Sequence, residues 1–246
     1  MAPRAARRAI ALRRRLEARR RLQVIEIAIA GAPQPYQVAA PADPDAVLDE
    51  IAAPVSVTAE SEPHMPYWAT PWASGLALAE VALVSRAEVA GRFVLELGCG
   101  LGVTATAALQ AGAALVVADC FAEALTYCRY NALRNAGAEP RTLLTDWRTE
   151  VGRRLLVAAG PFDLVLAADV LYEPEDVAPL LDLAPRLLRP GGRFWLAEPG
   201  RATSATFVRA ARERGWPVED HLTFERDWPG AAGFARVTVH RYVEVR

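Results

Sequence analysis

The chain has 246 residues, of which 52% are hydrophobic and 23% are charged, and its formal net charge is −1. This size fits one α/β domain with an N-terminal extension, and no stretch approaches the roughly 20 uninterrupted apolar residues of a membrane-spanning helix. The three cysteines lack metal-ligand spacing, which argues against a zinc site or a disulfide framework and favours a reducing, cytoplasmic location.

Arginine is concentrated at the N-terminus. Residues 1–22 hold nine arginines and one glutamate, a formal charge of +8, which leaves −9 for the rest of the chain. Within this segment, residues 4–22 place alanine and leucine on a narrow helical stripe, which predicts a basic helix. It is either a solvated helix, which we expect, or an arm for an acidic partner or nucleic acid. Its Arg-rich, acid-poor composition also fits a transit peptide.

Two short strands are predicted next. Residues 23–30 alternate branched apolar residues with polar or small ones, and residues 36–40 can pair with them across a turn that contains glycine and proline. A turn and a brief helix are expected over 41–53. We therefore divide the chain into an N-terminal extension, residues 1–60, and a main domain, residues 61–246.

An aromatic loop over residues 62–75 opens the main domain. It holds Tyr67, Trp68 and Trp72 among three prolines, so it cannot be one regular element and its rings must pack on something else. The rings either cover an edge of the sheet or form a lid over a ligand. As a lid, the loop would place Trp72 against the ligand and Tyr67 or Trp68 near a substrate. A helix is expected over 76–86.

The central element is the stretch 93–102, Phe-Val-Leu-Glu-Leu-Gly-Cys-Gly-Leu-Gly. Its first five residues predict a buried strand of a parallel sheet. Three glycines follow at alternate positions, where the missing β-carbon lets a ligand lie against bare backbone, and a helix is expected over 103–110. Glu96 precedes the turn, and its carboxylate would repel a pyrophosphate but attract a ligand that carries an ammonium and a sulfonium.

Carboxylates also follow the next two strands. The strand after the glycine turn ends in Asp119, about twenty residues further on, where doubly wound sheets hold the ribose hydroxyls of an adenosine. Asp119 is alternatively a cap for the helix expected over 121–135. The strand over 141–145 ends in Asp146 and Trp147. This pair suits an adenine, with the carboxylate as hydrogen-bond acceptor and the ring as cover, unless the tryptophan is a structural core residue.

Strands and helices continue to alternate up to the C-terminus. We expect strands over 162–168, 193–197, 218–224 and 236–245 and helices over 174–188 and 204–214, with a Pro-Gly-Gly turn at 189–192. The last two strands are joined by a turn and should pair antiparallel. The fold class predicted is α/β: a doubly wound, mostly parallel, seven-stranded Rossmann-like sheet with an antiparallel C-terminal strand.

These motifs resemble those of the class I (seven-β-strand) S-adenosylmethionine (SAM) methyltransferases. From Tyr67 to Arg201 the chain looks like the protein-lysine methyltransferases of that class, and most like the subgroup that modifies the β-subunit of electron-transfer flavoprotein. The likeness rests on Pro66-Tyr-Trp-Ala-Thr-Pro-Trp-Ala-Ser-Gly75, Glu96-Leu-Gly-Cys-Gly-Leu-Gly102, Asp146-Trp147, Asp169-Val-Leu-Tyr172 and Glu198-Pro-Gly-Arg201. Glu198 stands where the subgroup often has aspartate, a departure that keeps the charge.

The resemblance implies a SAM-dependent methyltransferase domain that needs no metal and methylates a nitrogen, most simply the ε-amine of a lysine in a protein. The β-subunit of electron-transfer flavoprotein is the candidate partner, and neither a membrane nor a nucleic acid is expected. The SAM site implied by the resemblance comprises Trp72, Glu96, Gly98, Cys99, Gly100, Asp119, Asp146, Trp147 and Ala168.

Asp169 and Tyr172 match the family's Asp-x-x-Tyr signature beside the target amine. We expect Asp169 to orient the amine through a hydrogen bond and not to remove its proton, because a carboxylate raises the pKa of a nearby amine. Tyr172, with Tyr67 and Trp68 of the loop, would wall the channel. The same fold would also serve an enzyme for a small amine or hydroxyl compound, or a binding module without catalysis.

Overall fold

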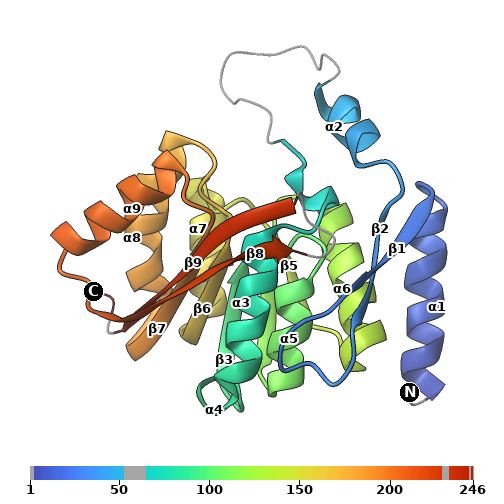
Figure 1. Ribbon diagram of the computed structural model, residues 1–246, viewed down its shortest axis with the longest axis horizontal. Helices are drawn as coiled ribbons and strands as arrows, with labels where there is room; N and C mark the ends of the chain where they lie inside the picture. Colours follow the sequence, from blue (N-terminus) through green and yellow to red (C-terminus); the bar gives the residue numbers. More distant parts are fainter. Residues whose placement is uncertain (1–2, 53–64, 229–232, 244, 246) are drawn as a thin grey trace.

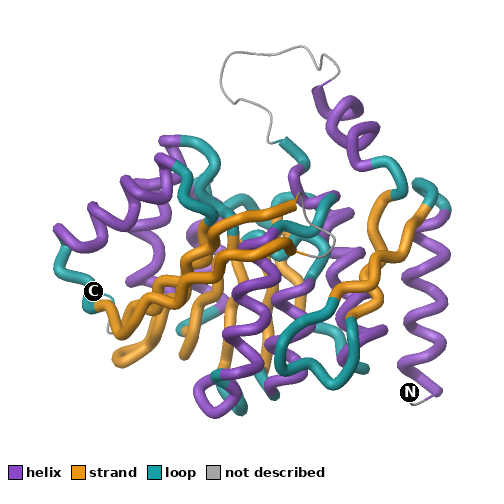
Figure 2. Tube along the Cα trace, in the orientation of Figure 1, coloured by secondary structure: helices purple, strands orange, loops and turns teal. Residues whose placement is uncertain are grey.

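The computed structural model describes residues 3–52, 65–228, 233–243 and 245. Its centre is a seven-stranded sheet with helices on both sides (Figures 1 and 2). In spatial order the strands are β5 (Arg141–Leu144), β4 (Ala114–Asp119), β3 (Phe93–Leu97), β6 (Phe162–Ala168), β7 (Leu188–Glu198), β9 (Gly233–Val243) and β8 (Val218–Trp228). The helices of this part are α3 (Ala73–Val84), α4 (Arg86–Val89), α5 (Val103–Ala111), α6 (Ala122–Ala136), α7 (Glu150–Ala159), α8 (Val177–Leu187) and α9 (Ala202–Glu213), with short 3-10 turns η1 (Tyr67–Ala69) and η2 (Pro174–Asp176).

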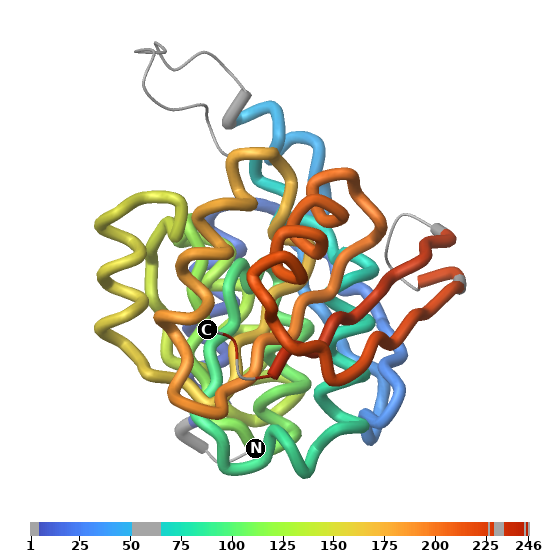
Figure 3. The backbone as a smooth tube through the Cα atoms, turned by 90° about the vertical axis from the view of Figure 1, so that its left-hand side faces the viewer, coloured from blue at the N-terminus to red at the C-terminus, as the bar shows by residue number. Residues whose placement is uncertain are grey.

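The strand directions confirm the predicted fold class. β5, β4, β3, β6 and β7 pair in parallel, whereas β9 runs antiparallel to both of its neighbours, β7 and β8. Figure 3 shows β8 and β9 side by side at the edge of the molecule. Because five strands are parallel, their carboxyl ends meet at one edge of the sheet, which is where open α/β sheets bind ligands.

The inner strands β3, β4 and β6 are buried on both faces, and their alternating side chains build two separate cores. In β4, Leu115 and Val117 belong to the core under α3, α5 and α6, whereas Val116 and Ala118 belong to the core under α8 and α9. A strand buried on both faces needs apolar residues at every position. This explains why these strands read as continuous hydrophobic runs in the sequence.

The N-terminal segment packs against α6. It consists of α1 (Pro3–Glu17), the antiparallel hairpin β1 (Leu22–Ile27) and β2 (Tyr36–Pro41), and α2 (Pro44–Ala52). Leu12 and Leu16 of α1 are buried, and the Asn131 amide on α6 bonds both the N–H and the C=O of Ala39 in β2, at 2.8 and 2.9 Å. The predicted basic helix and hairpin are therefore present, and their residues join the core on the α6 side of the sheet.

Two local features differ from the sequence prediction. The helix α7 was not predicted, and only Gly152 and Leu156 of its ten residues are buried. The segment 189–192, predicted as a turn, lies inside β7 and is accommodated by a register shift against β6. The turn predicted between the last two strands covers residues 227–230; Asp227 and Trp228 instead belong to β8, and residues 229 and 230 lie outside the described residues. No helix within the described ranges has the length and apolarity needed to cross a membrane.

Candidate active site

A pocket of about 470 Å³ lies at the carboxyl edge of the sheet. The turns that follow β3, β4, β5 and β6 line it, and the described part of the aromatic loop, residues 65–75, forms a further wall. Every site residue predicted from the sequence lines this one pocket, namely Tyr67, Trp68, Trp72, Glu96, Gly98, Cys99, Gly100, Asp119, Asp146, Trp147, Ala168, Asp169 and Tyr172. The volume of this pocket and its mixture of polar and apolar lining residues are typical of a small-molecule or cofactor site.

The glycine turn between β3 and α5 needs glycine for its backbone geometry. Gly98, Gly100 and Gly102 all have left-handed φ angles, at 66°, 48° and 81°, where a β-carbon is strained. A β-carbon on Gly102 would also lie 2.7 Å from Cα of Cys128. Glycine therefore lets α6 pack directly on the turn, and the turn presents backbone to the pocket.

Glu96 is a buried carboxylate that faces the pocket. Its side chain is only 2% exposed, and Oε2 has no hydrogen-bond partner among the described residues. Burial and the neighbouring Asp119 carboxylate raise the pKa of Glu96 well above its ordinary value, although a hydrogen bond from Thr104 opposes this shift. A buried carboxylate oxygen without a partner is energetically unfavourable. This oxygen is therefore available to a ligand that brings positive charge, and its predicted contact with a cofactor stays a prediction.

Asp119 holds the glycine turn and the start of α6 together. Its carboxylate accepts hydrogen bonds from the backbone N–H groups of Gly100, at 3.0 Å, and Phe121, at 2.9 Å. Burial raises the pKa of Asp119 to about 6, against the effect of these donors. Each carboxylate oxygen has more than one acceptor site, so the structural role leaves capacity for the predicted ribose contact. That contact stays a prediction.

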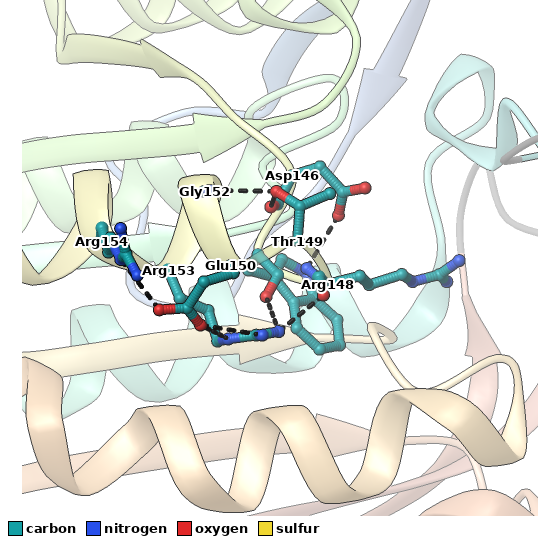
Figure 4. A network of polar contacts seen from close by, with 8 residues as sticks. Asp146, Arg148, Thr149, Glu150, Gly152, Arg153 and Arg154 are labelled. Atoms are coloured by element: carbon teal, nitrogen blue, oxygen red, sulfur yellow. Dashed lines mark hydrogen bonds and ion pairs between the residues drawn. The ribbon is translucent and has the colours of Figure 1, made fainter. Parts of the chain in front are cut away.

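A tight turn after β5 presents Asp146 and Trp147 to the pocket, and Figure 4 shows its polar network. The Asp146 carboxylate accepts a hydrogen bond from the N–H of Arg148, and its carbonyl accepts bonds from the N–H and hydroxyl of Thr149. Thr149 in turn caps α7 by accepting from the N–H of Gly152. A β-carbon on Gly152 would overlap the Asp146 carbonyl oxygen. The unpredicted helix α7 thus positions a predicted site residue.

Asp169 lies just beyond the end of β6 in a strained conformation. Its φ of 54° makes it the non-glycine residue with positive φ in the described chain, a conformation that aspartate and asparagine tolerate best. Its carboxylate is buried and accepts a two-point contact from the Arg201 guanidinium, Nε to Oδ1 at 3.0 Å and Nη2 to Oδ2 at 3.4 Å. Burial raises the pKa of Asp169, and Arg201 opposes that shift.

Aromatic rings surround the space next to Asp169. Tyr67 stacks on Tyr172 with ring centroids 4.7 Å apart, and Trp72 meets Tyr67 edge-on at 6.2 Å. Trp72 Nε1 donates to the carbonyl of Tyr67 at 2.6 Å, which fixes the bend of the loop. The Arg201 guanidinium lies 5.2 Å from the centre of the Tyr172 ring. Two of the three rings predicted to wall the channel, Tyr67 and Tyr172, therefore lie beside the Asp169–Arg201 pair.

Trp68 lies elsewhere in the pocket than its neighbour Tyr67. Its ring packs against Phe121 and Tyr127, at centroid distances of 6.4 and 5.4 Å, and its backbone lies over Gly100. Trp68 is thus next to the glycine turn and the start of α6. Its predicted contact with a substrate stays a prediction.

Sequence reasoning did not assign a role to three residues that shape this region. Phe121, two residues after Asp119, and Arg148, directly after Trp147, line the pocket, so their place after predicted site residues was an available signal. Arg201 was part of a quoted motif, but its contact with Asp169 spans 32 residues and only the fold reveals it. Within the described ranges, no group of three or more His, Cys, Asp or Glu side chains is arranged to hold a metal ion.

Comparison with known proteins agrees with this geometry. Residues 95–196 match the family model described as a methyltransferase domain. The chain is 33% identical over 143 residues to the electron transfer flavoprotein beta subunit lysine methyltransferase of Xenopus laevis, an alignment that covers 56% of this chain and 54% of the relative. It is 39% identical over 161 residues to the ribosomal protein L11 methyltransferase of Azotobacter vinelandii, covering 61% of this chain and 47% of that protein.

Solved structures of methyltransferases share the fold. The magnesium protoporphyrin IX methyltransferase of Synechocystis PCC 6803 superposes with a TM-score of 0.55 at 18% identity, over 69% of this chain and 79% of that one. The sheet order, the glycine turn and the matched segment define the class: the chain has the SAM-binding methyltransferase fold. It spans about half the length of the curated relatives that it matches.

Proposed function

We propose that the protein transfers the methyl group of SAM to a nitrogen acceptor, the ε-amine of a lysine in a protein substrate. The observation that carries this proposal is the buried Asp169 carboxylate beside the stacked rings of Tyr67 and Tyr172. It lies in the same pocket as the glycine turn and the unpaired Glu96 oxygen. One pocket therefore offers a cofactor end and an acceptor end.

The cofactor end fits SAM. Glu96 offers a buried, unpaired carboxylate oxygen to a ligand that carries positive charge. Asp119 would accept hydrogen bonds from the ribose hydroxyls. Asp146 would accept a hydrogen bond from the adenine, and the ring of Trp147 would cover it. SAM supplies an electrophilic methyl group, which an amine lone pair displaces in line: the C–N bond forms as the C–S bond breaks, and its electron pair stays on sulfur.

The acceptor end must present a neutral amine in one orientation. Positioning the lone pair behind the methyl group supplies most of the catalysis in such a displacement. A lysine with pKa near 10.4 is protonated at pH 7, so neutralising it costs about 3.4 pKa units, or roughly 5 kcal/mol. Tyr67 and Tyr172 withdraw the amine from water, which lowers its pKa, and Asp169 accepts a hydrogen bond from it.

Relatives support a protein as the acceptor. Both curated relatives described above are named for a protein that they methylate, one of them at lysine. The β-subunit of electron-transfer flavoprotein is the first candidate, because that name recurs among relatives at 33–35% identity. The partner and the target residue are part of this proposal.

The test uses purified protein, methyl-labelled SAM and a dialysed cell extract. Wild type is compared with Asp169→Asn, which keeps a residue that tolerates the left-handed backbone, and with Asp182→Asn, an exposed aspartate on α8. We expect label in a discrete protein band with wild type and Asp182→Asn and its loss with Asp169→Asn, while SAM binding persists in all three. Label found only in small molecules of undialysed extract, or none at all, would refute a protein acceptor.

A further inference from the structure

The contact between Asp169 and Arg201 raises a chemical question for the proposed reaction. The Asp169 side chain is 4% exposed and the Arg201 side chain 38%, so the carboxylate is enclosed while the guanidinium reaches the solvent side. Nε and Nη2 contact the two carboxylate oxygens, which is the fork-to-fork geometry of a strong charge-assisted pair. The acceptor group of the site is thus already paired with a cation.

An unpaired carboxylate at this place would work against methyl transfer. A carboxylate within about 4–6 Å of an amine favours its charged form and raises its pKa by roughly 1–3 units. The ammonium has no lone pair, so each added unit would lower the reactive fraction tenfold at pH 7. A site that orients lysine through Asp169 must therefore let a carboxylate oxygen accept a hydrogen bond from the amine while the negative charge of the carboxylate is prevented from raising the pKa of that amine.

We propose that Arg201 is a positioning residue that compensates the charge of Asp169, so that Asp169 accepts a hydrogen bond from the neutral amine of the substrate and does not stabilise the ammonium. Each carboxylate oxygen has a second acceptor site, so the pair with Arg201 leaves room for that bond. The nearby guanidinium also disfavours a second cation. Arg201 acts through Asp169, and the proposal rests on the methyl transfer to an amine proposed above.

Other charged and titratable groups of the described residues face this pair, and none of them replaces Arg201. Glu198, at the end of β7, adds negative charge near Asp169. Its own carboxylate is bound to the N–H of Gly200 at 2.6 Å and to His240 of β9 at 3.2 Å. Within the part of the chain that the structure describes, the remaining groups that bear on the pair are Tyr172, Tyr67 and, through Tyr172, Asp119. None of these supplies a positive charge in contact with Asp169.

The local backbone holds Arg201 where the pair requires it. Arg201 directly precedes α9, and Thr203 in the first turn of that helix donates to the carbonyl of Leu171 at 2.6 Å. The Asp169 N–H donates to the carbonyl of Ala197 at 2.9 Å. The segment after β6 is therefore joined to the end of β7 and to the start of α9, on either side of the ion pair, so the fold fixes the backbone that carries Arg201.

The first test measures kcat as a function of pH with saturating SAM and the labelled acceptor protein, because kcat reports groups in the complex. Arg201→Gln should move the acidic limb upward by about one pKa unit or more, with about tenfold lower kcat at pH 7 and near-normal kcat at high pH. Arg201→Lys should keep the wild-type limb. Arg209→Gln, which changes an exposed arginine of α9, is the matched control. An unmoved limb, or an equal loss at every pH with Arg201→Gln, would overturn the proposal.

The second test does not depend on the acceptor protein. n-Butylammonium, a probe of the lysine side chain, is titrated at pH 7 into protein saturated with S-adenosylhomocysteine and followed by NMR. Arg201→Gln should bind it about tenfold more tightly than wild type, and adding Asp169→Asn should abolish the gain. Equal binding by wild type and Arg201→Gln refutes the charge compensation. If Arg201→Gln binds n-butylammonium more tightly but no methylated protein is found in the labelling test, the charge compensation stands and only the protein acceptor of the proposed function is refuted.

Discussion

Replacing Glu96 with glutamine should weaken SAM binding and stabilise the free protein. The side chain is 2% exposed, its Oε2 has no partner among the described residues, and the Asp119 carboxylate adds repulsion. In the free protein this charge is therefore unfavourable, whereas a cationic ligand relieves it. Glutamine keeps the shape and removes the charge, so its effects on binding and on stability should have opposite signs.

The magnitude follows from the bond that is lost. A hydrogen bond to a charged group contributes roughly 1.5–3 kcal/mol, so Glu96→Gln should raise the Kd for SAM by about 10- to 150-fold. Isothermal titration calorimetry measures this, with Glu213→Gln as an exposed control on α9. A Kd within about twofold of wild type would refute the role of Glu96 as the carboxylate that meets the positive charge of the cofactor.

The pH dependence provides an independent check. Because the pKa of Glu96 is raised in the free protein and bound positive charge lowers it, binding should release protons, and SAM affinity should rise with pH until the raised pKa is passed. Titrations in buffers of different ionisation enthalpy measure the protons released, and Glu96→Gln should release fewer. If Glu96→Gln releases as many protons on binding SAM as wild type does, the protons come from another group, and Asp119 is the first candidate.

The same shifts determine the stability of the free protein. A carboxyl whose folded pKa is raised stabilises the fold fully below its unfolded pKa and loses that contribution as pH rises through the folded value. For Asp119, the shift from 3.8 to about 6 corresponds to about 3 kcal/mol lost between pH 4 and 7. Free wild-type protein should therefore unfold more readily at pH 7 than at pH 5, and saturating SAM should reduce the difference. A melting temperature that rises over this range would contradict both assignments.

Three further predictions concern packing. Gly102→Ala should lower the free energy of unfolding by about 2 kcal/mol more than Gly137→Ala, because both sites have positive φ but only Gly102 faces a backbone clash; equal losses in urea denaturation would argue against the clash. Leu16→Ala should cost about 2–5 kcal/mol in a single transition, whereas a separate early transition would show that the N-terminal extension unfolds alone. Tyr172→Phe should keep kcat within a few-fold because it keeps the stack on Tyr67, and Tyr172→Ala should not; a large loss with phenylalanine would assign a role to the hydroxyl.

Much of the fold was predictable because parallel strands have a strong sequence signal. Four of the five residues 93–97 are apolar, and the run ends at alternating glycines and is followed by a helical pattern, so one segment indicated the strand, the turn and the helix. The helix α7, by contrast, was missed. Its position depends on the Thr149 cap and on two buried residues, and the cap bond is visible only once the turn after β5 is built.

The candidate site was predictable where its residues directly follow strands. Asp119, Asp146 and Asp169 each come at or just after the end of a parallel strand, and the sheet brings such ends together whatever the details of packing. The aromatic loop was less predictable. Tyr67 and Trp68 are neighbours in a 3-10 turn and therefore point to different surroundings, one toward Tyr172 and the other toward Tyr127. Sequence spacing alone does not separate them.

Glu198 stands where the resembling subgroup often has aspartate, and its contact with β9 suggests a structural reason for the longer side chain. The Glu198 carboxylate bends back to the N–H of Gly200 with one oxygen and reaches His240 with the other. His240 of β9 lies opposite Leu196 of β7 and also contacts His221 of β8. A glutamate side chain is long enough to connect two parts of the structure, namely the turn that contains Arg201 and the antiparallel strand β9. The residue that differs from the subgroup pattern thus supports the position of the guanidinium that pairs with Asp169, which links the C-terminal strands to the acceptor end of the pocket.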